Sequence, residues 1–374
     1  MAARWPTACA RWRARRPVAR RAGTTKPGQP RRLRPRGSSP GASASGSPLA
    51  TPLGRPRACT RIVDSVDCQT ISPSAQERIE RVGFVGVGAM GAPMSARLAA
   101  GGFTTLIHDA DPDRAADVAG AGPRRAASLG EVATADAVIL MLPDSNAVEA
   151  VLLDGGLLDR MVPGSVLIDM SSSDARRTVG LGPSVAERGI AFADAPVSGG
   201  VARARTGELT VIVGADEALL ARIEPVLQTM AANVFRVGGL GSGHAAKALN
   251  NLLSATGLLI SVEAVEAGRR FGIEPSTLLA LINVSTGMNH ATQTKVERFV
   301  LSEQFDSGFR AGLMLKDLRL ADAICDEVGL GTGLAHAVVE QWAAATAQLA
   351  PAADQTEIAK VTAGALGAGA EAQR

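Results

Sequence analysis

The sequence predicts an α/β domain built on a parallel sheet, followed by an all-helical domain, with a long helix joining the two. Three observations lead to this prediction. Short apolar runs of strand length alternate with helical patterns from residue 82 to residue 237. At Gly238 the pattern changes, and apolar residues then recur at helical spacing for about 25 residues. Beyond that segment only helical patterns follow.

Residues 1–79 have a composition of their own, rich in Arg, Pro and Ser. Residues 1–63 contain 14 Arg and one Lys and no acidic residue. Because this region also lacks sustained periodicity, we expect a disordered extension. Removing its 15 cations from the 39 in the chain leaves 24 against 36 acidic residues, a net charge of −12 from residue 64 onward. The alkaline isoelectric point therefore belongs to the extension.

Three interpretations of the extension stay open. An Arg-rich, acid-free leader is typical of a mitochondrial transit peptide, which would place the protein in the matrix. A basic arm for nucleic acid is less favoured. We favour an upstream stretch translated from a start assigned too early, because the whole chain is rich in Ala, Gly and Arg and has only five Lys. This favours a cytoplasmic protein. No apolar run approaches a membrane span, so no membrane association is expected.

The four cysteines show no spacing typical of a metal site or a disulfide framework. They are Cys9, Cys59, Cys68 and Cys325, and three of them precede the first predicted strand. We therefore expect no bound metal.

Residues 82–109 carry the motif around which the chain is organised. A short apolar strand leads into Gly86, Gly88 and Gly91 in G-x-G-x-x-G spacing, and a helical pattern follows to Gly101. In such a unit the glycines permit a tight turn, close approach of backbone to a pyrophosphate, and close packing of helix on strand. The predicted domain over 80–240 is therefore a dinucleotide-binding Rossmann domain. The loop residues expected at the cofactor are Gly86, Gly88, Ala89, Met90 and Gly91.

Asp109 bears on the choice between NAD and NADP. It ends the second strand, 23 residues after Gly86. A carboxylate there accepts hydrogen bonds from the ribose of NAD and repels the 2′-phosphate of NADP. The next residue is Ala110 rather than Arg, and Arg114 is the only nearby cation in the sequence. We expect NAD to be preferred, with NADP use left open.

Further strands are predicted at 137–142, 165–170, 189–195, 206–214 and 234–237. The polar cluster Ser171 to Asp174 follows one of them and is either a helix N-cap or part of the nicotinamide side of the site. The turn Ser198-Gly199-Gly200 is either a flexible turn or a nest of backbone N–H groups suited to a carboxylate. The residues alone do not separate these readings.

Lys247 is unusual within the long helix, because its neighbours are Ala and Leu. Asn250 and Asn251 follow at three and four residues, so Asn251 shares its face of the helix. A partly desolvated lysine has a lowered pKa and can exchange a proton with an alcohol or a carbonyl oxygen. His244 faces a neighbouring direction and is the weaker candidate for this role.

The all-helical domain is predicted over 241–350, with helices at 274–284, 291–301, 313–327 and 335–349. Lys316 and Asp317 form either a local ion pair or a pair that reaches the cofactor, and most such pairs lie on the surface. Residues 351–374, rich in Ala, Gly and Gln, are predicted to be a flexible tail.

Four segments together resemble the β-hydroxyacid dehydrogenase family. They are V-G-F-V-G-V-G-A-M-G-A-P-M, D-A-P-V-S-G-G-V-A-R-A-R-T-G-E-L, G-S-G-H-A-A-K-A-L-N-N and F-D-S-G-F-R-A-G-L-M-L-K-D, and they cover about residues 82–350 in the family's order. The resemblance implies a Rossmann domain, a helical domain, and a homodimer or homotetramer.

The resemblance also implies roles for individual residues. Lys247 matches the family's catalytic lysine and Asn251 the asparagine that supports it, with Asn250 beside the substrate. The substrate-carboxylate motif falls on Ser198, Gly199 and Gly200. Positions matching the family's cofactor-lining residues are Leu142, Pro143, Ser173 and Lys316.

The function predicted is reversible hydride transfer between NAD and a small 3-hydroxy acid, 3-hydroxyisobutyrate-like, with Lys247 as general acid and base. The alternative is reduction of a semialdehyde, glyoxylate or sulfolactaldehyde by the same site. Imine-reducing relatives typically lack the lysine. A non-catalytic nucleotide-binding module with a basic arm is disfavoured, because Lys247 and Asn251 are present. The second domain is expected to shape the side-chain pocket, with Asn289, His290 and Thr292 as candidates.

Overall fold

The structure is a computed structural model that describes residues 78–120, 122–330 and 333–362. The predictions for residues 1–77 and 363–374 lie outside the described residues.

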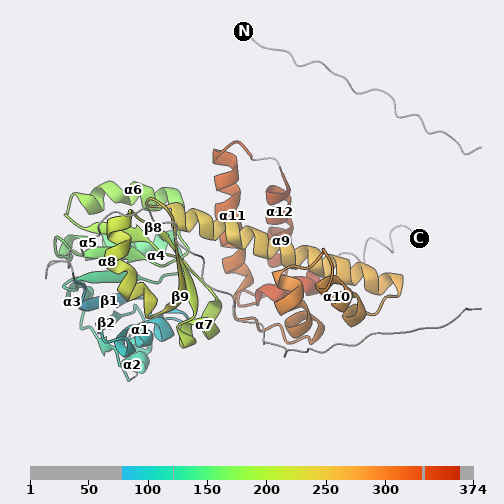
Figure 1. Ribbon diagram of the computed structural model, residues 1–374, viewed down its shortest axis with the longest axis horizontal. Coiled ribbons are helices and arrows are strands. Elements are labelled where there is room, and N and C mark those ends of the chain that lie inside the picture. Colours follow the sequence, from blue (N-terminus) through green and yellow to red (C-terminus); the bar gives the residue numbers. More distant parts are fainter. Residues whose placement is uncertain (1–77, 121, 331–332, 363–374) are drawn as a thin grey trace, which may run out of the picture. The chain divides into compact units, whose positions relative to one another are not determined.

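The first part is an α/β unit whose elements follow one another as the apolar patterns predict (Figure 1). Its strands are β1 (Arg81–Val85), β2 (Thr104–His108), β3 (Arg124–Arg125), β4 (Ala137–Leu140), β5 (Val166–Asp169), β6 (Ala191–Asp194), β7 (Val197–Ser198), β8 (Leu209–Gly214) and β9 (Ala231–Gly238). Its helices are α1 (Gly91–Ala100), α2 (Pro112–Ala119), α3 (Leu129–Val132), α4 (Ser145–Glu149), the π-helical η1 (Ala150–Asp154), α5 (Leu157–Arg160), α6 (Ala175–Ala186), α7 (Gly200–Thr206) and α8 (Glu217–Gln228).

The strands form one sheet in the order β3-β2-β1-β4-β5-β6-β8-β7, with β9 beside β8. Neighbours from β3 to β6 are parallel, whereas β8 runs antiparallel to β6 and β7. The order of the first six strands is that of a dinucleotide-binding Rossmann sheet. Its strand order reverses between β1 and β4, so ligands are expected at the carboxyl ends of these strands. The predicted fold class is confirmed.

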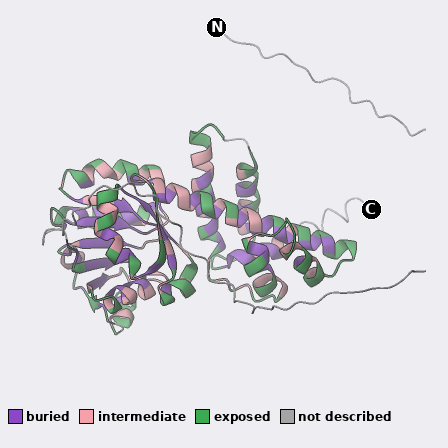
Figure 2. Ribbon diagram, in the orientation of Figure 1, coloured by how far each residue is buried: buried purple, intermediate pink, exposed green. Residues whose placement is uncertain are grey.

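Both faces of the sheet are covered, which explains the continuous apolar runs (Figure 2). Alternate residues of β4 point into different cores: Ala137 and Ile139 lie in one cluster, and Val138 and Leu140 in the other. Residues of α1, α2, α7 and α8 contribute to the first cluster. Residues of α3 to α6 and η1 contribute to the second.

α9 (Ser242–Phe271) is the long joining helix, and it packs on β8 at its start and on α11 further along. By length and composition alone it is apolar enough to cross a membrane, contrary to the prediction that no run approaches a span. However, 44% of its most apolar window is buried inside the structure. The core helix of a protein that does not span a membrane passes the same test of length and composition.

The second part of the described chain contains only helices. They are α10 (Pro275–Asn283), the π-helical η2 (Thr292–Leu301), α11 (Ala311–Glu327), α12 (Leu334–Thr346) and the short 3₁₀ helix η3 (Gln355–Glu357). Trp342 of α12 is fully buried in a core shared with α9 and α11. Each predicted helical segment therefore has a counterpart in the structure.

The prediction of a flexible tail from residue 351 is wrong for residues 353–359. Asp354 accepts hydrogen bonds from Ser307 and from the backbone of Gly308 and Phe309, and it caps η3. Ile358 and Ala359 are buried in the core of the helical domain. Their composition resembles that of a tail, but these contacts come from residues about fifty positions earlier, which a local sequence pattern does not reveal.

Helix α7 is a further difference, because the sequence pattern predicted no helix at Gly200–Thr206.

Candidate functional site

The glycine turn after β1 leaves room for a ligand. Gly86 has a φ of +93°, which favours glycine, and a Cβ atom at Gly88 would meet nothing within 4 Å. Within the described part of the chain, the backbone N–H groups of Ala89 and Met90 donate to no acceptor. Met90 caps α1 without a side-chain bond. These N–H groups at a helix N-terminus fit the pyrophosphate of a dinucleotide.

Asp109 lies beside this turn. One carboxylate oxygen accepts the backbone N–H of Val87 at 2.8 Å, and the other accepts that of Asp111 at 2.9 Å. These bonds fix the carboxylate at the end of β2 and leave it lone pairs for further donors. The position suits the two hydroxyls of an adenosine ribose. The described residues therefore fit a nicotinamide dinucleotide.

Two cations lie near Asp109. Arg114 is exposed and pairs with Asp111 at 3.2 Å. Arg125 lies beside the carboxyl end of β2, because it pairs with Ile107 across β3 and β2. The pKa of His108 is lowered mainly by burial, and the charge of Arg125 lowers it further. Arg125 is not identified by the sequence pattern, because only the pairing of β3 with β2 brings it to this end of the sheet.

The residues after β4 and β5 meet each other at the same edge of the sheet. The Leu142 N–H donates to Ser171 Oγ at 3.0 Å, and the Leu142 side chain lies against Gly86. Pro143 is exposed beside it. Ser173 is buried, and its hydroxyl donates to Asp169 at 2.8 Å. Asp174 is the N-cap of α6. Of the two readings of this cluster, the N-cap applies to Asp174.

Ser198, Gly199 and Gly200 form the turn between β7 and α7. Gly199 and Gly200 have φ values of +129° and +69°, and both are exposed. A Cβ at Gly200 would meet nothing within 4 Å, whereas a Cβ at Gly199 would lie 2.8 Å from the Arg203 side chain, so the turn faces open space at Gly200. It begins four residues after Asp194, which bonds the first turn of α9. No hydrogen bond among the described residues joins this turn to Lys247.

Lys247, Asn251 and Asp317 come together between α9 and α11. Asn251 is buried and donates from Nδ2 to Asp317 at 2.6 Å. Asp317 is 1% exposed and also pairs with Lys316 at 2.8 Å. Lys316 in turn donates to the carbonyl oxygen of Ser172, just beyond β5. The cluster therefore meets the carboxyl edge of the sheet, where the glycine turn also lies.

Burial lowers the pKa of Lys247, Asp317 opposes this, and the charge of Lys316 adds to it. The amine is thus easier to deprotonate than an exposed lysine. The sequence leaves Lys316 and Asp317 open as a local ion pair or a pair that reaches the cofactor, and in the structure Asp317 is buried. Its signal in the sequence was the apolar setting of L-M-L-K-D, together with the need of Asn251 for a partner.

His244 belongs to a separate buried network. Its Nδ1 lies 2.9 Å from Thr178 Oγ1, and its backbone N–H donates to Asp194 at 2.7 Å. Gly241 N–H donates to the other oxygen of Asp194 at 2.6 Å. Asp169 lies 3.7 Å from His244 Nε2. The ring is fully buried on the first turn of α9.

The three pocket candidates of the helical domain differ in their surroundings. Asn289 donates to Ser261 at 3.0 Å and accepts from the backbone of Ala291 and Thr292, so it organises the start of η2. The Thr292 hydroxyl bonds Asn289 in return. His290 is exposed, and its pKa is lowered by burial of part of the ring and by the charges of Lys295 and Arg203. Only His290 has a side chain free of such a capping role.

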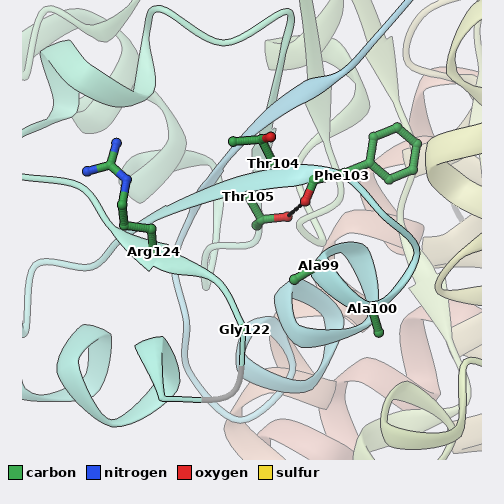
Figure 3. A pocket seen from close by; sticks show the side chains of 7 residues that line it. All are labelled: Ala99, Ala100, Phe103, Thr104, Thr105, Gly122 and Arg124. Carbon is green, nitrogen blue, oxygen red and sulfur yellow. Dashed lines mark hydrogen bonds between the residues drawn. The ribbon is translucent and has the colours of Figure 1, made fainter.

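A hollow of about 350 Å³ lies elsewhere on the α/β unit (Figure 3). It is lined by the end of α1, the start of β2 and the start of β3, at residues Ala99, Ala100, Phe103, Thr104, Thr105, Gly122 and Arg124. Figure 3 shows the Thr105 hydroxyl turned to the carbonyl of Phe103, to which it donates at 3.1 Å. This is the amino edge of β2, opposite the glycine turn, so the hollow is not the cofactor crevice.

Two family models match the chain in succession. The NAD-binding domain of 6-phosphogluconate dehydrogenase matches residues 81–239. The NAD-binding domain of NADP-dependent 3-hydroxyisobutyrate dehydrogenase matches residues 241–362. The chain belongs to the β-hydroxyacid dehydrogenase family. It is an oxidoreductase that uses a nicotinamide dinucleotide, and the resemblance predicted from its four segments is confirmed.

Individual relatives agree with this family. The 2-(hydroxymethyl)glutarate dehydrogenase of Eubacterium barkeri is 38% identical over 247 residues, 66% of this chain and 82% of that protein. The mitochondrial 3-hydroxyisobutyrate dehydrogenase of Bos taurus is 39% identical over 248 residues, 64% of this chain and 74% of that protein. Among solved structures, the 3-hydroxyisobutyrate dehydrogenase of Mycobacterium tuberculosis with L-serine has a TM-score of 0.70 at 30% identity, covering 76% and 99% of the two chains.

Proposed function

We propose that this member of the family transfers hydride reversibly between NAD and a small 3-hydroxy acid, with Lys247 as the general acid and base. The observation that carries the proposal is the cluster of Lys247, Asn251 and Asp317. It places an amine of lowered pKa at the carboxyl edge of the sheet, the edge at which the glycine turn fits a dinucleotide.

In oxidation, neutral Lys247 accepts the proton of the substrate hydroxyl at its Nζ. In reduction, the protonated amine returns that proton to the carbonyl oxygen. Bound NAD supplies the hydride acceptor, and NADH the donor. Asn251 donates to Asp317 at 2.6 Å, which fixes its amide one helical turn from Lys247. The fixed amide positions the substrate hydroxyl or carbonyl oxygen at the Lys247 amine.

Substrate orientation comes from the turn at Ser198, Gly199 and Gly200. Its exposed backbone and the Ser198 hydroxyl suit a carboxylate, because successive N–H groups in such a turn attract anions. With the carboxylate held there, the carbinol carbon is directed toward the nicotinamide. Lys316 and Leu142 are the side chains we assign to the cofactor side of the site, with Asn250 on the substrate side.

The preference for NAD over NADP rests on Asp109. Its carboxylate, fixed by two backbone N–H groups, favours ribose hydroxyls over a 2′-phosphate. Arg125 is the cation placed to moderate this preference. Replacing Asp109 by Ala should weaken NAD binding by about tenfold and narrow the gap to NADP. Binding of both reduced cofactors by fluorescence titration checks this, and an unchanged ratio contradicts it.

A homodimer or homotetramer is supported by apolar side chains exposed on the helical domain. Leu253 and Ile260 of α9 are 75% and 54% exposed, and Val284 after α10 is 85% exposed. Such residues favour burial against another copy of the chain. Sedimentation of the purified protein tests this.

For the compartment we retain the prediction of the cytoplasm, with the mitochondrial matrix as the alternative. Fusing residues 1–63 to a fluorescent protein in eukaryotic cells decides whether they direct import.

The experiment that tests the activity is the initial rate of NAD and NADP reduction with a panel of acids. The panel contains 3-hydroxyisobutyrate, L-serine, glycerate, threonate, 4-hydroxybutyrate, a sulfonate analogue and 2-(hydroxymethyl)glutarate. Turnover with NAD on one acid supports the proposal. If no acid is oxidised but NADH still binds, a reductase of semialdehydes or a non-catalytic nucleotide-binding module is favoured instead. A salt-sensitive gel shift with nucleic acid, measured with and without residues 1–63, would detect the non-catalytic module with its basic arm.

A further inference from the structure

Lys295 is a second buried lysine, outside the cluster around Lys247. It lies on η2 and is 9% exposed. Its ammonium donates to Ser254 Oγ and to Gln355 Oε1, each at 3.2 Å. Both partners are neutral, and no carboxylate in the described part of the chain lies within ion-pair distance of it. An ammonium has three N–H donors, so one is left for a further acceptor.

The carboxylate that most affects Lys295 is already occupied. Asp354 opposes the fall in the pKa of Lys295, which burial lowers to about 8. The two oxygens of Asp354 accept from Ser307, Gly308, Phe309 and Thr356. Burying a charged amine without an anion is costly, and an apolar side chain would fill the same space without that cost. The native residue therefore points to an anion that the chain itself does not supply.

The position of Lys295 relates it to the site of reaction. Ser254 follows Lys247 by seven residues on α9, which is two turns, so both residues lie on one face of the helix. Two turns span about 10 Å along the axis. The charge of Lys247 contributes to the lowered pKa of Lys295, and the charges of Lys295 and Arg203 both act on His290. The helix face beyond Lys247 is thus bordered by cations.

We propose that Lys295 binds a second carboxylate of the substrate, so that the preferred substrate is a 2-(hydroxymethyl) dicarboxylate. This inference rests on the proposed function, because it extends the same substrate site. Lys295 Nζ contacts Ser254 at 3.2 Å, and Ser254 lies two turns beyond Lys247 on the same face of α9. A substrate whose hydroxyl meets Lys247 can therefore extend a second acidic group along this face to Lys295. In 2-(hydroxymethyl)glutarate three carbons separate the hydroxymethyl group from the distal carboxylate.

The test compares two acids that differ only in the distal group. They are 2-(hydroxymethyl)glutarate and 2-(hydroxymethyl)pentanoate, in which a methyl group replaces the second carboxylate. The native enzyme should prefer the dicarboxylate by ten- to a hundredfold in kcat/KM. Lys295→Met should remove this preference, mainly through the KM of the dicarboxylate, and change kcat/KM of the monocarboxylate by less than about threefold.

Controls separate binding from folding. Lys360→Met removes an exposed lysine that pairs with Glu357 and should keep the native preference. Lys295→Gln, which retains donors for Ser254, serves if Lys295→Met fails to fold. An equal loss on both acids would assign Lys295 a structural role and overturn the proposal, as would a native enzyme without preference.

A binding measurement distinguishes this inference from the proposed function. If no acid of the whole panel is oxidised, the proposed function fails, but glutarate and butyrate can still be compared as ligands of the NADH complex by thermal shift. Stabilisation by glutarate of the native protein and not of Lys295→Met supports the second carboxylate site. Equal responses to both acids overturn it.

Discussion

Two buried polar clusters lie on α9, and they differ in how completely their groups bond one another. On the first turn, Asp194 accepts the N–H groups of Gly241 and His244, and the His244 ring bonds Thr178. One to two turns later, Lys247 has a buried amine with no hydrogen bond to a described residue. Both clusters bear the cost of burying polar groups.

This difference in internal hydrogen bonding distinguishes a structural cluster from a reactive site. The Asp194 cluster connects β6, α6 and α9, and its donors and acceptors are largely consumed internally. In the Lys247 cluster, Asn251 and Asp317 bond each other, and the Lys247 amine is left to bond another molecule. Disrupting the first should therefore affect stability, and disrupting the second should affect turnover.

The largest effect is expected for Lys247→Ala. Removing the acid–base group should lower kcat by about 10²- to 10⁴-fold. Affinity for NADH should change little, because the glycine turn and Asp109 belong to other elements. Steady-state rates and NADH fluorescence check the two expectations. Loss of NADH binding in the variant would contradict the division between the cofactor and proton-transfer residues.

Asp317→Asn sharpens the comparison by removing a charge and keeping an oxygen for Asn251. Because Asp317 raises the pKa of Lys247, its loss should lower that pKa further. Oxidation needs the neutral amine and rises with pH through this pKa, so its pH limb should move to lower pH. Reduction needs the protonated amine and should fall at lower pH than in the native enzyme.

The plateau rate of Asp317→Asn should drop on the order of tenfold, because Lys316 loses its charged partner. The pH profiles of kcat in both directions measure these effects. An unshifted limb would exclude Asp317 as the group that sets the charge of Lys247.

Asp194→Asn should reverse the pattern, with a loss of stability and a nearly native kcat. The amide has one acceptor oxygen for two backbone donors, so one donor is left unsatisfied at a cost of about 1–3 kcal/mol. Burial raises the pKa of Asp194, so the folded state favours its protonated form. The protonated carboxyl therefore stabilises the folded state at low pH, and this stabilisation is lost as pH rises through the folded-state pKa. Unfolding in urea across pH should show a weaker dependence in the variant. A large fall in kcat with an unchanged free energy of unfolding would contradict this assignment of Asp194 to the fold.

The smallest effect is expected for Thr178→Val, which removes one hydrogen bond to His244 and keeps the shape of the side chain. The free energy of unfolding should fall by about 0.5–1.5 kcal/mol. Kinetic constants should stay native, since Thr178 lies on α6, away from Lys247. Urea unfolding and steady-state kinetics measured side by side provide the check.

Local pattern predicted much of the fold and the composition of the candidate site. The glycine spacing, Asp109 and the alternation of apolar runs are short-range features, because turn geometry and side-chain periodicity act over a few residues. Lys247 and Asn251 also stand four residues apart on one helix, so their shared face follows from sequence alone. The interpretation of Ser198-Gly199-Gly200 needed the family resemblance.

Other features depend on residues far apart in the chain. Asn251 meets Asp317, Lys295 meets Gln355, and Lys316 meets Ser172, at separations of 66, 60 and 144 residues. The packing of residues 353–359 and the burial of Asp317 arise from such contacts. A polar residue in a sequence does not reveal whether its neighbour in space is water, a carboxylate or an apolar core.

The sequence by itself determined most of the elements, their order and the cofactor-binding turn, since these follow from backbone sterics and apolar periodicity. Tertiary structure alone decided which polar groups satisfy one another and which are left to bind a substrate. The reason is physical: the cost of a buried charge depends on the partners within a few ångströms of it, and those partners are brought together only by the packing of α9, η2 and α11.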